Sequence, residues 1–138
     1  MSNFASSFTP LAARILLSSM FLWSGLGKVF AYSTMVGYAA SKGLPFGGIA
    51  VACAAVIEIL GGLAVITGFH TRVVAWVLFV YLIPTTIIFH NYWALQSAVR
   101  LDTQTHFMKN LAIMSGLLLL AHFGAGDFAF DSTSKKVS

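Results

Sequence analysis

The fold is decided by one apolar stretch, GIAVACAAVIEILGGLAVITGF, which covers residues 48–69 and holds a single charged residue, Glu58. A helix that crosses a bilayer needs about 20 mostly apolar residues, so this stretch is long enough to span a membrane. On either side of it, three further stretches approach that length, at residues 11–31, 73–89 and 107–123. The sequence therefore predicts an all-α fold, a four-helix transmembrane bundle.

The composition agrees with this prediction and excludes other classes of protein. Hydrophobic residues make up 58% of the 138 residues and charged residues 9%, whereas an average soluble domain has about 25% charged residues. This excludes a disordered chain, a coiled coil and an ordinary soluble enzyme, and makes the lipid bilayer the expected partner. Apart from Lys135 and Lys136 in the tail, the basic residues are scattered singly, so no nucleic acid partner is expected. Cys53 is the one cysteine, which excludes an intramolecular disulfide and CxxC motifs.

The connections between the predicted helices are unequal. Residues 70–72 join the second and third helices, so these two helices are antiparallel neighbours. Residues 32–47 and 91–106 form longer, polar connections. We expect the polar tail, residues 124–138, to fray.

An even number of spans places both chain termini on one side of the membrane. We call that end of the bundle the terminal end, and the end with the two longer connections the distal end. If Lys28 and Lys109 are counted as lying within the membrane, the remaining basic residues favour cytoplasmic termini. The chain is thus expected to be a multi-pass membrane protein.

Polar residues inside the spans bear on function, because ionisable groups in a membrane are costly and usually face the bundle interior. Most of these residues gather in the distal half of the predicted bundle. We take them as candidate ligand-binding residues: Lys28, Glu58, His90, Asn91, His106, Lys109 and Asn110. The histidines have no HxxxH or HxxE spacing, so no metal site is expected, and no catalytic residue can be assigned.

Glu58 lies at the middle of its helix and needs a partner. Side chains on a helix lean towards its N-terminus, so Lys28 on the first helix and Glu58 on the antiparallel second helix converge. We therefore predict that Glu58 pairs with Lys28. Arg14 leans the other way and is expected to reach the interface by snorkelling. Simpler structural roles stay open for His90 and His106 as interfacial residues, and for Lys109 as a snorkelling one.

Several motifs resemble those of the DoxX family, and the resemblance covers nearly the whole chain in order. The matching motifs are Arg14-Ile15-Leu16-Leu17, Gly25-Leu26-Gly27-Lys28, Glu58-x-x-Gly61-Gly62, Gly68-Phe69-x-Thr71-Arg72, Phe89-His90-Asn91-Tyr92-Trp93, Phe107-Met108-Lys109-Asn110-Leu111-Ala112 and Gly124-Ala125-Gly126 before Asp131. The family usually ends in a Ser-Leu-Asp type sequence, and Ala129-Phe130-Asp131 stands in its place here.

The resemblance implies a small four-helix protein of the bacterial inner membrane. The family name derives from a relative of a thiosulfate:quinone oxidoreductase subunit, and some relatives are linked to redox complexes. It therefore implies a redox-associated membrane subunit that docks a soluble oxidoreductase and holds a quinone, with His90, His106 and Lys109 donating to its carbonyls. The chain has no cysteine pair and no flavin or nicotinamide fingerprint, so whether it is an enzyme stays open.

A second class of function also stays open. Glu58 could act as the carrier group of a small transporter for a proton-coupled or anionic solute. Four helices are few for a monomeric transporter, so this alternative requires a homo-oligomer.

Overall fold

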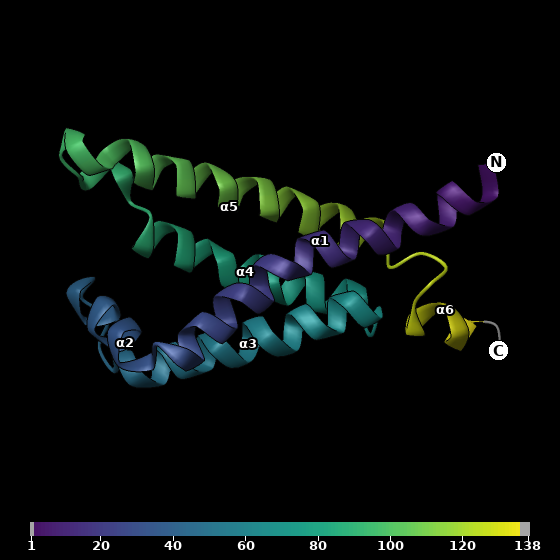
Figure 1. Cartoon of the computed structure of the whole chain (residues 1–138), viewed down its shortest axis with the longest axis horizontal. Coiled ribbons are helices and arrows are strands. Elements are labelled where there is room, and N and C mark those ends of the chain that lie inside the picture. The colour runs from purple at the N-terminus through teal and green to yellow at the C-terminus, as the bar shows by residue number, and fades with distance from the viewer. Residues whose placement is uncertain (1, 136–138) are drawn as a thin grey trace.

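The computed structural model describes residues 2–135, and the side chains of residues 6–132. All regular elements in this part of the chain are helical, which confirms the all-α fold (Figure 1). They are α1 (Ser2–Phe30), α2 (Tyr32–Ser41), α3 (Gly47–Thr67), α4 (Thr71–Phe89), the 3-10 turn η1 (Tyr92–Ala94), α5 (Ser97–Phe123) and α6 (Phe130–Lys135).

The long helices form an elongated membrane bundle built from two pairs. Helix α1 packs mainly on α3, and α4 packs mainly on α5. The two pairs meet where α3 contacts α4, because only residues 68–70 separate these helices. Both chain ends lie at the same end of the bundle, the terminal end, while α2 and η1 lie at the distal end (Figure 1).

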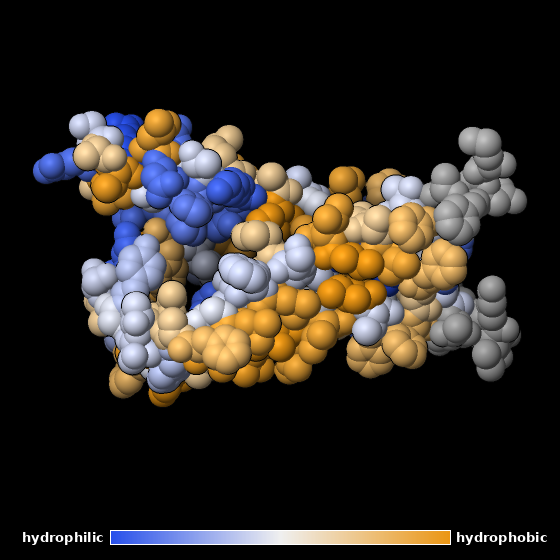
Figure 2. Space-filling model, in the orientation of Figure 1, coloured by the Kyte–Doolittle hydropathy of each residue, from blue (hydrophilic) through white to orange (hydrophobic). Residues whose placement is uncertain are grey.

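The outer surface of the bundle is apolar. Three segments are long and apolar enough to cross a membrane: Ser6–Phe30, Gly47–Thr67 and Thr71–Ala94. Large apolar side chains cover their outer faces (Figure 2), as expected of helices that face lipid. Helix α5 is 27 residues long but has charged residues in its first half, so the fourth span over residues 107–123 stays a prediction.

The helices extend beyond the apolar stretches from which they were predicted. The connection over residues 32–47 contains α2, and the connection over residues 91–106 contains η1 and the first turns of α5. Helix α1 begins at Ser2 rather than near residue 11. Apolar stretches locate the part of a helix that crosses the hydrocarbon region. The helix itself continues past it, because its hydrogen bonds are made within the segment in either environment.

The C-terminal segment folds back onto the terminal end, so the prediction that the tail frays is wrong for this part of it. The carboxylate of Asp131 accepts hydrogen bonds from the backbone N–H groups of His70 and Thr71, both at 2.8 Å. The N–H of Asp131 donates to the carbonyl of Gly68 at 2.9 Å. Asp131 therefore caps α4 from a distant part of the sequence. Residues 136–138, the end of the predicted tail, lie outside the described residues.

Arg14 is held by the same segment. Its side chain is buried, 1% exposed, and donates to the carbonyls of Val65 and Phe128. The prediction that Arg14 snorkels to the interface is therefore wrong, because the returning C-terminal segment offers carbonyls inside the bundle. Gly68 has φ +72° and makes this close approach feasible: a Cβ there would lie 2.3 Å from Arg14 Nη1.

Asp131→Ala tests the role of the C-terminal segment. Loss of the cap should lower the free energy of unfolding by about 0.5–2 kcal/mol, measured by thermal or denaturant unfolding in detergent. Asp127→Ala is the matched control, since Asp127 accepts one hydrogen bond from Ser7 at an exposed position. Equal losses in the two variants would contradict the capping role.

The same variant has a predicted pH dependence. Burial alone would raise the pKa of Asp131, but the hydrogen bonds from Thr71 and His70 outweigh it and leave the pKa below its ordinary value. A carboxyl group with a lowered folded-state pKa stabilises the fold above its unfolded pKa of about 3.9. The stability difference between wild type and Asp131→Ala should therefore persist at neutral pH and disappear as the pH falls below about 4. A difference that is constant through this range would contradict the prediction.

Candidate functional site

A cavity of about 440 Å³ lies between the two helix pairs in the distal half of the bundle. Side chains from α1 to α5 line it, and most of the lining is apolar. Figure 2 shows the hollow on one face, between α2 and the first turns of α5. Polar side chains lie in two groups, an inner group around Glu58 and an outer group at the distal rim.

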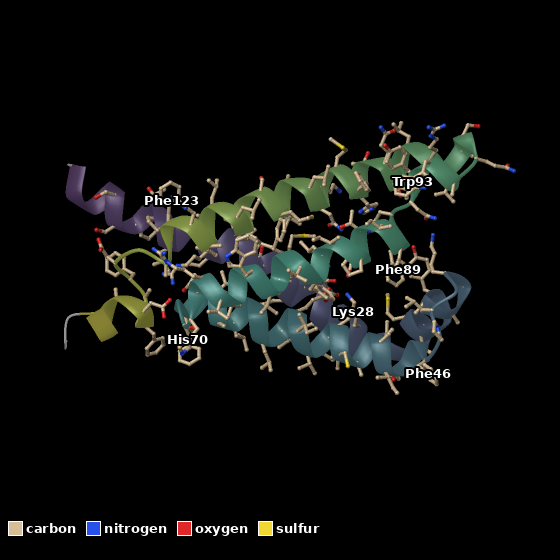
Figure 3. The ribbon with its side chains drawn as sticks, turned by 180° about the vertical axis from the view of Figure 1, so that it is seen from behind. Lys28, Phe46, His70, Phe89, Trp93 and Phe123 are labelled. Carbon is tan, nitrogen blue, oxygen red and sulfur yellow. The ribbon has the colours of Figure 1, made fainter. Side chains whose placement is uncertain are left out.

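The inner group is a charge pair with two neutral partners. Lys28 Nζ lies 2.8 Å from Glu58 Oε2 and 3.0 Å from Oε1, which confirms the predicted pairing. Lys28 also donates to Ser24 Oγ at 2.7 Å, and the hydroxyl of Tyr81 donates to Glu58 Oε1 at 2.7 Å. Glu58 is 4% exposed, and Lys28 lies in the interior of the bundle (Figure 3).

The local sequence allows this network to form. Ser24 and Lys28 are four residues apart on α1, which places them on one face of the helix. Between them, Gly25 lets α1 approach α3, because a Cβ at Gly25 would lie 2.7 Å from Ile59 Cγ1 and 3.1 Å from Glu58 Cβ. Two opposite charges inside a membrane stabilise each other only when the geometry is close and the remaining hydrogen bonds are satisfied. The network meets both conditions.

The outer group joins α4 to α5 at the rim of the cavity. The rings of His90 and His106 stack with centroids 5.5 Å apart and an angle of 16° between their planes. His106 is about half exposed and lies 3.7 Å from the carboxylate of Asp102. One turn further into the bundle, the Asn110 amide donates to Thr86 Oγ1 at 2.9 Å. The rim therefore offers imidazole and amide groups beside a largely apolar interior.

The sequence from the first third of α1 to just beyond the end of α4 matches a known family. The DoxX family profile matches residues 9–91, a range that includes Lys28, Glu58 and His90. The chain belongs to the DoxX family. It is 32% identical over 121 residues to the inner membrane protein YphA of Escherichia coli (strain K12), covering 88% of this chain and 86% of YphA.

Two further relatives show how far the similarity extends. The inner membrane protein YqjF of the same organism is 35% identical over 126 residues, covering 91% of this chain and 92% of YqjF. The ER-derived vesicles protein ERV29 of Saccharomyces cerevisiae is 31% identical over 80 residues, 58% of this chain and 26% of ERV29. No solved structure matches the chain. This DoxX protein is therefore an integral membrane protein of the bacterial inner-membrane type.

Five of the seven candidate residues line the cavity of this DoxX protein: Lys28, Glu58, His90, His106 and Asn110. Asn91 and Lys109 do not. Asn91 accepts a hydrogen bond from Lys42 Nζ at 3.4 Å, and Lys109 is exposed. At 100° per residue, Asn110 lies 40° from His106 around α5, whereas Lys109 lies 60° away on the other side. That rotation turns Lys109 out of the cavity.

Sequence reasoning missed Tyr81 and Ser24. Neither is charged in its ordinary state, and the search was directed at ionisable groups. A signal existed for Tyr81, because a phenol in the middle of an apolar helix usually finds a hydrogen-bond partner when buried. Glu58 was the acceptor within reach on the neighbouring helix.

Breaking the charge pair should destabilise the protein strongly. Lys28→Ala leaves the buried Glu58 charge without its partner, and we expect a loss of about 3–5 kcal/mol in the free energy of unfolding. Adding Glu58→Gln should recover part of that loss, which a double-mutant cycle in detergent measures.

Arg14 provides the control for this cycle. Arg14→Ala combined with Glu58→Gln should show no recovery, because Arg14 bonds Val65 and Phe128 rather than Glu58. Coupling of Glu58 to Arg14 and none to Lys28 would show that the pairing is wrong.

Proposed function

We propose that this DoxX protein is a redox-associated membrane subunit that binds a quinone-like ligand in the distal cavity. The observation that supports the proposal best is the cavity itself, which combines mostly apolar walls with hydrogen-bonding groups at its rim and its inner end. A volume of about 440 Å³ falls within the usual range of small-molecule sites, about 300–1,000 Å³.

The chemistry of a quinone fits these walls. Its ring is flat and apolar on both faces, and its two carbonyl oxygens accept hydrogen bonds. Phe21, Leu82 and Ile88 provide apolar surface for the ring. His90, His106 and Asn110 provide N–H groups at the rim for one carbonyl. Lys28, 20% exposed, lies at the inner end, and its ammonium would donate to the other carbonyl in place of Ser24 Oγ.

A soluble oxidoreductase would supply electrons to the bound quinone or accept electrons from it. The sequence has no cysteine pair and no flavin or nicotinamide fingerprint. Flavins and nicotinamides carry out hydride transfer in oxidoreductases, so the partner would have to contain the redox cofactor. A partner that docks at the distal end would lie next to the rim of the cavity, where His106 is exposed.

The contacts of Glu58 favour this proposal over the transporter alternative. A carrier carboxylate must exchange its proton during the transport cycle. Glu58 instead accepts hydrogen bonds from Lys28 and Tyr81 at 2.7–3.0 Å, so a solute or proton could reach its carboxylate only after these contacts had been broken.

Ligand binding can be tested at the rim histidines. We expect His90→Ala and His106→Ala each to weaken binding of a water-soluble quinone analogue roughly 2- to 10-fold, the usual effect of one hydrogen bond. Equilibrium dialysis of the purified protein in mild detergent measures the Kd. His122→Ala is the control, because His122 is exposed near the end of α5 at the terminal end.

Equal effects on the Kd at all three histidines would show that the ligand does not bind in this cavity. Absence of quinone binding together with proton-linked solute uptake by proteoliposomes would favour the transporter. Mass spectrometry of lipids that co-purify with the protein identifies the natural ligand directly.

We also infer that both termini face the cytoplasm. Reporter fusions at Ser138 and within residues 43–47 should give opposite locations, with Ser138 cytoplasmic. Two fusions on the same side of the membrane would contradict the even number of spans, and a periplasmic Ser138 would reverse the orientation.

A further inference from the structure

Helices α1 and α5 border the cavity but separate towards the distal end. They approach closely near Gly116, where an added Cβ would lie 3.4 Å from Leu17 Cδ1. From there α1 follows α3 while α5 follows α4, and the two helices diverge (Figure 1). Among the described elements, α1 and α5 are not a major packing pair. Side chains of both helices line the cavity where they diverge, and we call this side of the cavity the gap between α1 and α5.

The residues of α1 and α5 on this side of the cavity lie at the depth of the predicted membrane. Met20 and Ser24 on α1, and Asn110 and Ile113 on α5, all line the cavity. Met20 is 48% exposed and lies near the middle of the membrane-spanning segment Ser6–Phe30. An opening at that depth faces hydrocarbon rather than water.

The polarity of the lining changes along the gap. Met20 and Ile113 are apolar and lie nearest the close approach of α1 and α5, whereas Ser24, Lys28 and Asn110 lie one or two turns further towards the distal end. A ligand with a polar head would place that head among the hydrogen-bonding groups, since a buried polar group is costly without a partner. An attached hydrocarbon chain would then lie between Met20 and Ile113 and continue into the lipid.

We propose that the cavity is loaded laterally from the bilayer through the gap between α1 and α5, and that its ligand is an amphiphile. The acceptor-bearing head lies near Lys28 and Asn110, and the long hydrocarbon tail passes between Met20 and Ile113. For a quinone-like head this inference rests on the proposed function, but the tail subsite and the route of entry are separate claims.

Photo-crosslinking in lipid nanodiscs tests both claims. One probe is a benzoquinone with a decyl chain that has a diazirine midway along it, and the second has the diazirine on a short arm next to the ring. Peptide mass spectrometry locates the labelled residues. We expect the chain diazirine to label Met20, Ile113 or their immediate neighbours, and the ring diazirine to label residues around Lys28 and Asn110. An excess of unlabelled quinone should suppress both.

A variant that fills the gap supplies an independent readout. Ile113→Trp should lower labelling inside the cavity by the decyl probe at least several-fold. Leu119→Trp is the matched control, because Leu119 lies on the same helix and is 60% exposed. Thermal unfolding of both variants checks that they fold. If Ile113→Trp does not fold, the residues labelled in the wild-type protein still show whether the hydrocarbon chain lies between Met20 and Ile113.

The possible outcomes separate the two proposals. Labelling by the chain diazirine around Tyr38 on α2 and Leu44 just after it, with no effect of Ile113→Trp, would overturn lateral entry and place the route at the distal end. Failure of both probes to label the cavity, or labelling that unlabelled quinone does not suppress, would instead contradict the proposed quinone binding.

Discussion

The pairing of Lys28 with Glu58 is the interaction on which the rest of the bundle depends. A carboxylate near the middle of a membrane-spanning helix is costly unless an opposite charge meets it, so α1 must lie against α3 at this level. Gly25 allows the approach, and Tyr81 brings α4 to the same carboxylate. One buried charge thereby fixes the relative positions of three helices. Because the charge pair replaces apolar packing at this level, it also leaves polar groups next to an open cavity.

The two ends of the bundle differ in how they are closed. At the terminal end, Asp131 caps α4 and Arg14 bonds the returning chain, so buried polar groups tie α1, α3, α4 and the C-terminal segment together. At the distal end, the contact between α4 and α5 includes stacked histidines and one side-chain hydrogen bond. Helices α1 and α5 lie further apart there than near Gly116. The terminal end is thus closed by a returning segment of the chain, whereas the cavity of the proposed ligand lies in the distal half.

Much of this arrangement can be predicted from sequence because the membrane imposes simple constraints. Length and hydropathy locate the spans, and the lean of helical side chains predicts that Lys28 and Glu58 meet. The same reasoning failed where a distant segment changed the environment. Arg14 was expected at the interface, but the fold brings the carbonyl of Phe128 to it, and nothing near Arg14 in the sequence indicates that contact. Lys109 was grouped with His106 and Asn110 because positions i, i+3 and i+4 share one face of a helix, but that face is wide enough for Lys109 to turn out of the cavity. Asn91 was grouped with the site because it follows His90 at the end of the third predicted helix. Helix α2 was missed because a short interfacial helix has no long apolar stretch to indicate it.

The most direct test of this account is the distance between Lys28 and Glu58 in a bilayer. Glu58 is the only glutamate in the chain, so selective ¹³C labelling of glutamate and ¹⁵N labelling of lysine isolates one acidic site for rotational-echo double-resonance solid-state NMR in lipid. The Lys28–Glu58 pair predicts strong dephasing between the lysine side-chain nitrogen and the glutamate carboxyl carbon, consistent with N···O distances of 2.8–3.0 Å. That dephasing should be lost in Lys28→Arg, which lacks the labelled ammonium. No dephasing in the wild-type protein, or dephasing that persists unchanged in Lys28→Arg, would contradict it.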